Sequence, residues 1–146
     1  MLLDSLSVVQ NLAVPFTLDI DPLRKEIRDR VVALAREVGL PEAVWSRPLT
    51  EIDEADRMRI RLARALALDP AIVLLEHPTA TLAPHHLVPF GRQIRAVGQR
   101  RGTATLALTA DASFAAAVAT HVLALEPATG RLKKKRRFGW FGRRLG

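Results

Sequence analysis

The chain has 146 residues, of which 49% are hydrophobic and 25% charged, with a formal net charge of +7 and no cysteine. This length suits a single domain with a sizeable core, and the lack of cysteine excludes disulfides and thiolate metal sites. No apolar run approaches the ~20 residues of a membrane-spanning helix, so we expect a cytoplasmic protein.

The positive charge is concentrated in the last sixteen residues. Residues 131–146 hold eight Lys and Arg and no acid, which leaves fourteen basic and fifteen acidic residues elsewhere. Three interpretations stay open for this segment: an anionic membrane surface, nucleic acid bound by stacking and phosphate contacts, or a solvated tail. The candidate residues are Lys133, Lys134, Lys135, Arg136, Arg137, Phe138, Trp140, Phe141, Arg143 and Arg144.

The first part of the chain predicts helices. Residues 1–18 are apolar-rich and are expected to form an irregular entry. Asp21 and Pro22 favour the start of a helix, the first as its cap and the second in its first turn. An apolar stripe at helical spacing follows, and Gly39 is expected to end it. The stripe consists of Ile27, Val31, Leu34 and Val38. A short second helix is expected over residues 41–45.

The central stretch predicts a helix, a break and a strand. Its helix has apolar residues at i, i+4, i+7 and i+8, and Asp69-Pro70 ends it. These apolar residues are Met58, Leu62, Ala65 and Leu66. The unbroken apolar run 71–75 is typical of a strand covered on both faces in a parallel sheet. Glu76 and His77 follow it, where ligands bind in open α/β sheets.

Further along, helices and strands alternate. Phe90, Ile94 and Val97 form the apolar stripe of the next helix, and Gly102 is expected to end it. The remaining expected elements are a helix over 87–101, a buried strand over 103–109, a helix over 112–120 and a strand over 122–125. This alternation favours a parallel α/β sheet.

Four of these segments carry a family resemblance. Residues 63–70 read Ala-Arg-Ala-Leu-Ala-Leu-Asp-Pro, and residues 74–79 read Leu-Leu-Glu-His-Pro-Thr. They are similar to the end of the signature helix and to the Asp-Glu-Pro-Thr strand end of ABC transporter ATPases. Residues 6–15 resemble the segment after that family's Q-loop, and residues 105–111 resemble its switch strand. The resemblance covers nearly the whole chain, to about residue 130.

The resemblance implies an α/β fold, namely part of a P-loop NTPase (RecA-like) parallel sheet. It implies a helical subdomain over residues 1–51 and an α/β core over 52–130, followed by the basic aromatic tail at 131–146. It also implies ATP and Mg²⁺ as cofactors. The expected partners are a second nucleotide-binding domain, in a homo- or heterodimer, and a membrane permease. The chain would then lie peripherally at the inner face of the cell membrane.

No G-x-x-x-x-G-K-[ST] phosphate loop occurs in the sequence. In the family, the phosphate-loop strand lies between the strands that correspond to residues 103–109 and 122–125. We therefore expect a gap in the sheet with unpaired strand edges. Three origins stay open: an upstream start, a separate polypeptide that supplies the first half, or a decayed remnant.

The family's signature falls on Asp53, Glu54, Ala55 and Asp56, where ABC ATPases use Ser and two Gly to receive the γ-phosphate. A helix N-terminus suits an anion, but three carboxylates would repel a polyphosphate. The acidic residues instead favour a helix that satisfies its own N-terminus, with Asp53 as the cap.

At the strand end, Glu76 takes the position of the Asp that holds Mg²⁺, and it keeps a carboxylate for a weak metal contact. His77 takes the position of the catalytic Glu, where it cannot supply a negative charge, although a His can act as a general base. Ala110 takes the position of the switch His and has no polar atom to contact a phosphate.

These residues predict a truncated and degenerate ABC-transporter ATPase-like subunit that has lost hydrolysis. Since the family it resembles hydrolyses ATP, the sequence leaves open whether the chain is an enzyme. The first alternative is a non-catalytic structural partner, or a membrane-tethered accessory, of an intact ABC ATPase. The second is nucleic-acid binding through the basic tail, which would weaken steeply with added salt.

Overall fold

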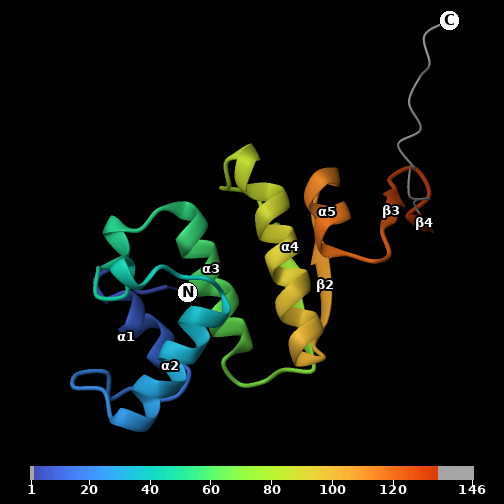
Figure 1. The fold of residues 1–146 in the computed structure, drawn as a ribbon. Helices are drawn as coiled ribbons and strands as arrows, with labels where there is room; N and C mark the ends of the chain where they lie inside the picture. Colours follow the sequence, from blue (N-terminus) through green and yellow to red (C-terminus); the bar gives the residue numbers. More distant parts are fainter. Residues whose placement is uncertain (1, 135–146) are drawn as a thin grey trace, which may run out of the picture.

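The structure, a computed structural model, describes residues 2–134 (Figure 1). In chain order the elements are α1 (Val8–Ala13), α2 (Lys25–Glu37), the 3-10 helices η1 (Glu42–Val44) and η2 (Leu49–Glu51), α3 (Glu54–Leu66), β1 (Ile72–Glu76), α4 (Pro84–Arg101), β2 (Ala104–Leu108), α5 (Ala112–Val118), β3 (Leu123–Glu126) and β4 (Arg131–Lys134). The predicted α/β class is confirmed, with helices before a parallel strand pair.

Two small sheets are formed by the described residues. Strands β1 and β2 are parallel and in register from Ile72 beside Ala104 to Glu76 beside Leu108, with α4 as the crossover between them. Strands β3 and β4 form a separate antiparallel hairpin. Residues 122–125 were expected to belong to the parallel sheet, but β3 pairs only with β4. Part of the basic segment, Arg131–Lys134, is therefore a strand.

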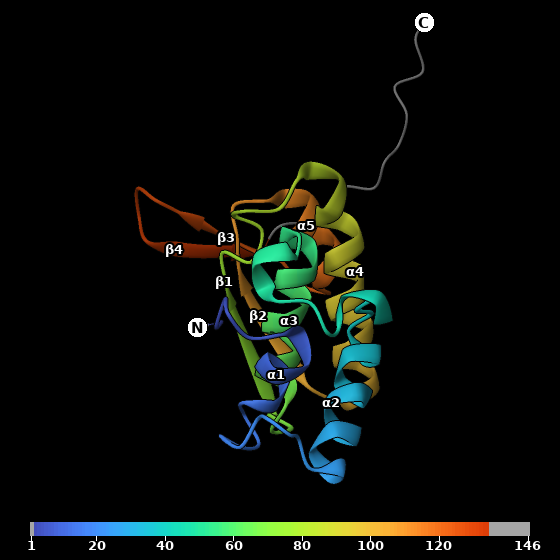
Figure 2. The same ribbon diagram turned by 90° about the vertical axis from the view of Figure 1, so that its left-hand side faces the viewer.

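The parallel sheet is covered on one face only. Val73 is buried against the helices, whereas Ile72 and Leu74 on the other face are 67% and 61% exposed. Figure 2 shows β1 and β2 on one side of the molecule, with α2 and α4 on the opposite side. The expectation that both strands are buried on both faces is wrong, because no described element packs on the second face.

The first eighteen residues are not irregular as expected. Ser7 and Gln10 form a capping box that starts α1, and Val8 and Leu12 on this helix are fully buried. Asn11 is also buried, and its side chain donates hydrogen bonds to three backbone carbonyls. The expected irregular entry is therefore interrupted by a capped helix over residues 8–13, with turns and bends on either side of it.

Two helix predictions need correction. Helix α2 begins at Lys25 with Arg24 as its N-cap residue, and the expected start at Asp21 and Pro22 is instead a bend. In α3, Ala65 is exposed, because the buried face runs through Ile60 and other residues instead. The remaining buried residues of α3 are Ala55, Asp56, Met58, Leu62, Ala63 and Leu66.

Other signals are confirmed. Val31, Leu34 and Val38 are buried along α2 and Gly39 follows with a φ of +65°, a left-handed conformation that favours glycine. Helix α4 starts three residues before the expected position, with Pro84 at its first position, and Gly102 ends it in the left-handed conformation.

Close packing joins α4 to α5. The rings of Phe90 and Phe114 stack with centroids 6.3 Å apart, and Phe114 is fully buried. A Cβ atom on Gly91 would lie 2.9 Å from the Cβ of Ala117 and 3.2 Å from the carbonyl oxygen of Phe114. Glycine at this position therefore lets α5 approach the backbone of α4.

A half-buried arginine joins the helices to each other. The Arg101 guanidinium donates to both carboxylate oxygens of Glu37, at 2.8 and 2.5 Å, and to the carbonyl oxygen of Leu66 at 2.7 Å. It also pairs with Asp69 at 2.8 Å. The hydrogen bond from Arg101 lowers the pKa of the Glu37 carboxyl below its ordinary value.

We expect Glu37→Gln to lower the free energy of unfolding at neutral pH by about 1–3 kcal/mol, since it weakens a charge-assisted bidentate pair. A lowered folded-state pKa stabilises the fold above the ordinary carboxyl value of 4.5, and the stabilisation is lost as the pH falls through the folded-state pKa. Urea unfolding across this range should therefore show the wild type and the variant converging in acid.

The matched control is Glu51→Gln, which removes an exposed carboxylate that makes no described ion pair. It should follow the wild type at every pH. A wild-type and Glu37→Gln difference that is constant with pH would contradict the assignment.

Candidate functional site

The candidate site lies where β1 and β2 end side by side. The His77 backbone N–H donates to the carbonyl oxygen of Leu108 at 2.9 Å, which extends the strand pairing by one residue. The hydroxyls of Thr79 and Thr109 lie 3.4 Å apart across the same gap, and Thr79 is buried. The structure thus brings the segment after Glu76 beside the segment that leads to Ala110.

His77 has a left-handed backbone, with a φ of +44°, which is uncommon for a residue other than glycine. Its carbonyl accepts a hydrogen bond from the N–H of Ala80 at 3.2 Å. The backbone of His77 therefore takes part in the turn that follows β1. The side chains of Glu76 and His77 are exposed, and neither makes a hydrogen bond, ion pair or ring contact with another described residue.

The strand end lacks a metal-binding constellation. Glu76 and Asp111 are the carboxylates of this region, and no group of three or more His, Asp or Glu in the described part of the chain could hold a metal ion. Mg²⁺ is bound by oxygen ligands in near-octahedral geometry. The described residues therefore do not fit a magnesium ion held by the protein alone.

The acidic turn at the start of α3 is satisfied internally. Asp53 is the N-cap, and its Oδ1 accepts a hydrogen bond from the N–H of Asp56 at 2.8 Å, which confirms the predicted cap. Asp56 is itself buried and accepts from Nη1 of Arg59 at 2.6 Å. Glu54 adds a second carboxylate in the first turn, with Oε2 buried and lacking a hydrogen bond among described residues. This helix N-terminus does not fit a phosphate.

The acidic turn and the strand end are separate groups. No hydrogen bond or ion pair among the described residues joins Asp53, Ala55 or Asp56 to Glu76 or His77. The turn instead packs into the helical part of the molecule through buried Ala55 and Asp56.

Known proteins resemble the chain in sequence, although no family model matches it. It is 30% identical over 104 residues to the histidine/lysine/arginine/ornithine transport ATP-binding protein HisP of Escherichia coli. This match covers 70% of the chain and 39% of HisP. It is 35% identical over 119 residues to the lipoprotein-releasing system ATP-binding protein LolD of Bordetella pertussis, covering 79% of the chain and 49% of LolD. Its homologues are ABC transporter ATP-binding proteins.

Solved ABC cassettes share the fold. A post-hydrolysis dimeric ATP-binding cassette, MJ0796 with ADP and Pi, aligns with a TM-score of 0.72 and 22% identity over 94% of this chain and 60% of its own. Another dimeric structure of MJ0796 aligns with a TM-score of 0.63 over 79% of this chain and 50% of its own. The chain spans less than half the length of HisP and LolD.

The described part of the chain has no helix that is long and apolar enough to cross a membrane. Of the predicted basic cluster, Lys133 and Lys134 lie in β4, and Nζ of Lys133 pairs with the Glu126 carboxylate at 2.6 Å. That bond lowers the pKa of the Glu126 carboxyl below its ordinary value. The other members of the predicted cluster lie outside the described residues.

An open sheet edge adds a feature of this ABC-type fold. A cavity of about 470 Å³ lies between β2, α5 and the β3–β4 hairpin, and β2 and β3 do not pair with each other in the described part. Its lining is mostly apolar and includes Leu106, Val118 and Leu123. The expected interruption between these strands is thus present.

The Thr79–Thr109 contact is a site feature that the sequence did not reveal.

We expect Asp53→Ala to lower the free energy of unfolding by about 1 kcal/mol, because an N-cap acceptor for the Asp56 N–H is lost. Asp53→Asn keeps a capping oxygen and removes only the charge, so its stability should stay close to that of the wild type. Urea denaturation of the three proteins measures both effects. An equal loss in the two variants would show that charge, rather than capping, is what matters.

Proposed function

We propose that this chain acts as an ABC-type ATP-binding subunit that does not itself hydrolyse ATP. The strand end supports this proposal most directly, because exposed His77 stands in the position of a carboxylate and Ala110, two residues after β2, has no polar side chain. Activation of water needs a positioned base, and the γ-phosphate needs donors aimed at it. The described side chains supply neither arrangement.

The acidic turn supports the same proposal. In an ABC dimer a signature helix would offer free N–H groups to a phosphate. Here the Asp53 cap and the buried Asp56 already occupy that position with carboxylates. Because groups that act together in catalysis are not additive, the loss of one group already removes most of the activity, and restoring one of three lost groups would not recover it.

ATP enters this proposal from the names of the relatives, and Mg²⁺ enters it from the family resemblance of the sequence. HisP and LolD are named ATP-binding proteins, and MJ0796 was solved with ADP and Pi. Glu76 is the described residue that would offer Mg²⁺ a weak oxygen ligand, and the strand end does not fit a metal held by protein groups alone. We derive no catalytic step through either group.

Purified protein should release no phosphate from ATP above buffer. His77→Glu restores a carboxylate, and His77→Gln is its matched neutral control. We expect all three proteins to be inactive, because the acidic turn and Ala110 are unchanged. Phosphate release by the wild type that His77→Gln lowers by about tenfold or more, the range of a general base, would contradict the proposal and assign His77 as that base.

We further propose that the chain lies at the cytoplasmic face of the membrane, against a permease and a second cassette. The relatives are named for transport and lipoprotein release, and the MJ0796 cassettes are dimeric. A hollow of about 670 Å³ beside α1, lined in part by Val9, Leu23 and Trp45, offers a surface of mixed polarity for a permease segment.

The open edge of β2 favours a second candidate, a structural partner of an intact ABC ATPase. The N–H of Ala104 and the carbonyl of Leu108 point to the β1 side. Since backbone groups alternate along a strand, those of Thr105 and Ala107 point to the open edge. Such an edge takes up an extended segment by strand addition, and the apolar cavity beside it would hold that segment's side chains.

Thr105→Pro tests this candidate, because proline removes the outward N–H and is tolerated on an unpaired edge. The control is Thr105→Val, which keeps the N–H. We expect both variants to unfold at similar urea concentrations. Tagged protein from the source cells should lose co-purifying cassette subunit, quantified by mass spectrometry, with Thr105→Pro only. Equal recovery with both variants would exclude strand addition at this edge.

A further inference from the structure

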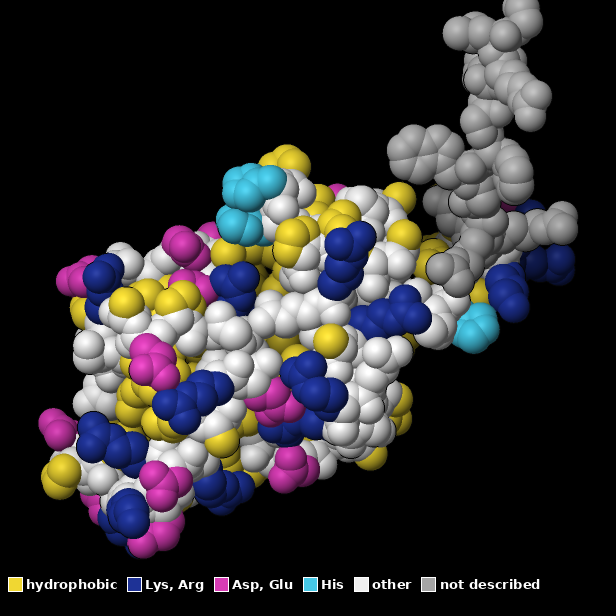
Figure 3. All heavy atoms as spheres, viewed as in Figure 1, with side chains coloured by type: hydrophobic (Ala, Val, Ile, Leu, Met, Phe, Trp, Pro, Cys, Tyr) yellow, Lys and Arg dark blue, Asp and Glu magenta, His cyan; other side chains and the backbone are white. Residues whose placement is uncertain are grey.

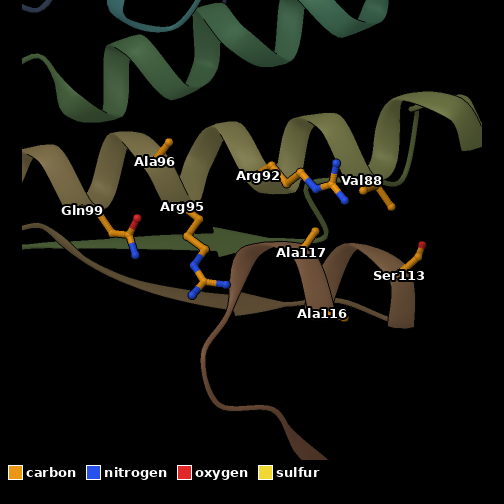
Figure 4. Close-up of a pocket in the computed structure, with 8 residues that line it drawn as sticks. All are labelled: Val88, Arg92, Arg95, Ala96, Gln99, Ser113, Ala116 and Ala117. Atoms are coloured by element: carbon orange, nitrogen blue, oxygen red, sulfur yellow. The ribbon is translucent and has the colours of Figure 1, made fainter. Parts of the chain in front are cut away.

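A basic hollow lies on the outer face of α4 and α5, away from the strand ends. Its volume is about 380 Å³, and its charged lining residues are Arg92 and Arg95. Gln99 and Ser113 add neutral hydrogen-bonding side chains. Val88, Ala96, Ala116 and Ala117 complete the lining (Figure 4). The small alanines leave the polar side chains accessible from solvent.

Arg95 differs from the other half-buried arginines of the described chain. Arg57, Arg59 and Arg101 each donate to a carboxylate, a carbonyl or an amide oxygen, and Arg64 also has a partner. The half-buried Arg95 guanidinium has no hydrogen bond or ion pair among residues 2–134. A guanidinium has five donors, and partial burial without a partner removes water from them at a cost.

The surroundings of Arg95 do not supply a counter-charge. Arg92 lies three residues earlier on α4, and helical residues at this spacing are neighbours about 5–6 Å apart at Cβ. Neither α4 nor α5 contains an Asp or Glu. The nearest carboxylate in sequence is Asp111, which precedes α5 and does not line the hollow. Two like charges therefore face one hollow, an arrangement that an anion would relieve.

The side chains of the hollow can be followed in Figures 3 and 4. Figure 4 shows the side chains of Arg92 and Arg95 leaving α4, with Ser113, Ala116 and Ala117 presented by α5. In Figure 3, Lys and Arg side chains lie over the α4–α5 part of the surface among apolar atoms. The lining is spread along the two helices, with Gln99 at one end, Ser113 at the other, and Arg92 and Arg95 between them.

We propose that this hollow binds a phosphate monoester or free phosphate, independently of any nucleotide at the strand ends. Two guanidiniums line the space between Gln99 and Ser113. A phosphate group carries about −1.5 to −2 charge and can accept bidentate hydrogen bonds from a guanidinium, so it suits two neighbouring arginines better than a singly charged carboxylate does. Arg95 supplies the charge that is held near the helix surface, and Arg92 supplies the exposed one.

The test is a titration of the full chain with inorganic phosphate at constant ionic strength, followed by the NMR amide shifts of Gln99 and Ser113. We expect saturable shifts in the wild type. The double variant Arg92→Gln/Arg95→Gln should bind about tenfold more weakly or worse, because two charge-assisted hydrogen bonds are lost. The matched control, Arg24→Gln/Lys25→Gln, removes two exposed charges from α2 and should bind like the wild type.

Ala116→Glu is a second variant that leaves both arginines in place and adds a carboxylate to the exposed wall of the hollow. It should abolish the shifts. No saturable shift in the wild type would overturn the proposal. Equal weakening in the two double variants would overturn it as well, since it would indicate general charge attraction.

Vesicles distinguish the sources of the phosphate. Phosphatidylcholine vesicles that contain phosphatidic acid should retain the wild type and the α2 control more strongly than Arg92→Gln/Arg95→Gln if a lipid headgroup is bound. Equal retention of all three, together with the phosphate shifts, would assign the site to a soluble phosphate. All proteins carry the same basic C-terminal segment, so its contribution cancels.

Discussion

The arrangement of the helices depends on the Arg101 guanidinium. It joins the end of α2 through Glu37 and the end of α3 through the carbonyl of Leu66, and it belongs itself to the last turn of α4. Gln93 adds a second tie, since it donates to the carbonyl of Val38 and accepts from Arg59. A two-stranded sheet with one covered face buries little apolar area, so the relative positions of the helices must come from contacts between helices. A half-buried charge is stabilising in that role only when all its partners are present.

This constraint explains where sequence reasoning succeeded. The order α3, β1, α4, β2 follows from local signals, because apolar periodicity, Asp69-Pro70 and Gly102 each act within a few residues. The same local signals could not predict how many layers cover a strand. Ile72 and Leu74 lie in an unbroken apolar run, yet they are exposed because nothing among the described residues packs on their face. Likewise, helical spacing placed Ala65 on the apolar stripe of α3 and did not include Ile60, whereas in the structure Ile60 is buried and Ala65 is exposed.

The candidate site shows the same division. The family resemblance assigned Glu76, His77 and Ala110 to positions of one ATP site, and the parallel register of β1 and β2 brings Glu76 beside Leu108 at one edge. The Thr79–Thr109 contact and the unpartnered Arg95 depend on neighbours that are distant in sequence. No periodicity or motif carries such information. Pairing a half-buried cation with its acceptors is a property of the folded chain, so its absence could be found only in the structure.

The acidic turn suggests why loss of a phosphate site would be tolerated on the function proposed above. A helix that presents Ser and Gly to a ligand leaves its first N–H groups unsatisfied until the ligand arrives, and glycine there costs conformational entropy. With Asp53 as cap and Asp56 paired to Arg59, the N-terminus of α3 satisfies its own donors. Carboxylates in the first turn also interact favourably with the helix dipole. Stability and phosphate binding therefore compete for the same N–H groups, and in this chain the carboxylates stabilise the fold at the expense of the ligand.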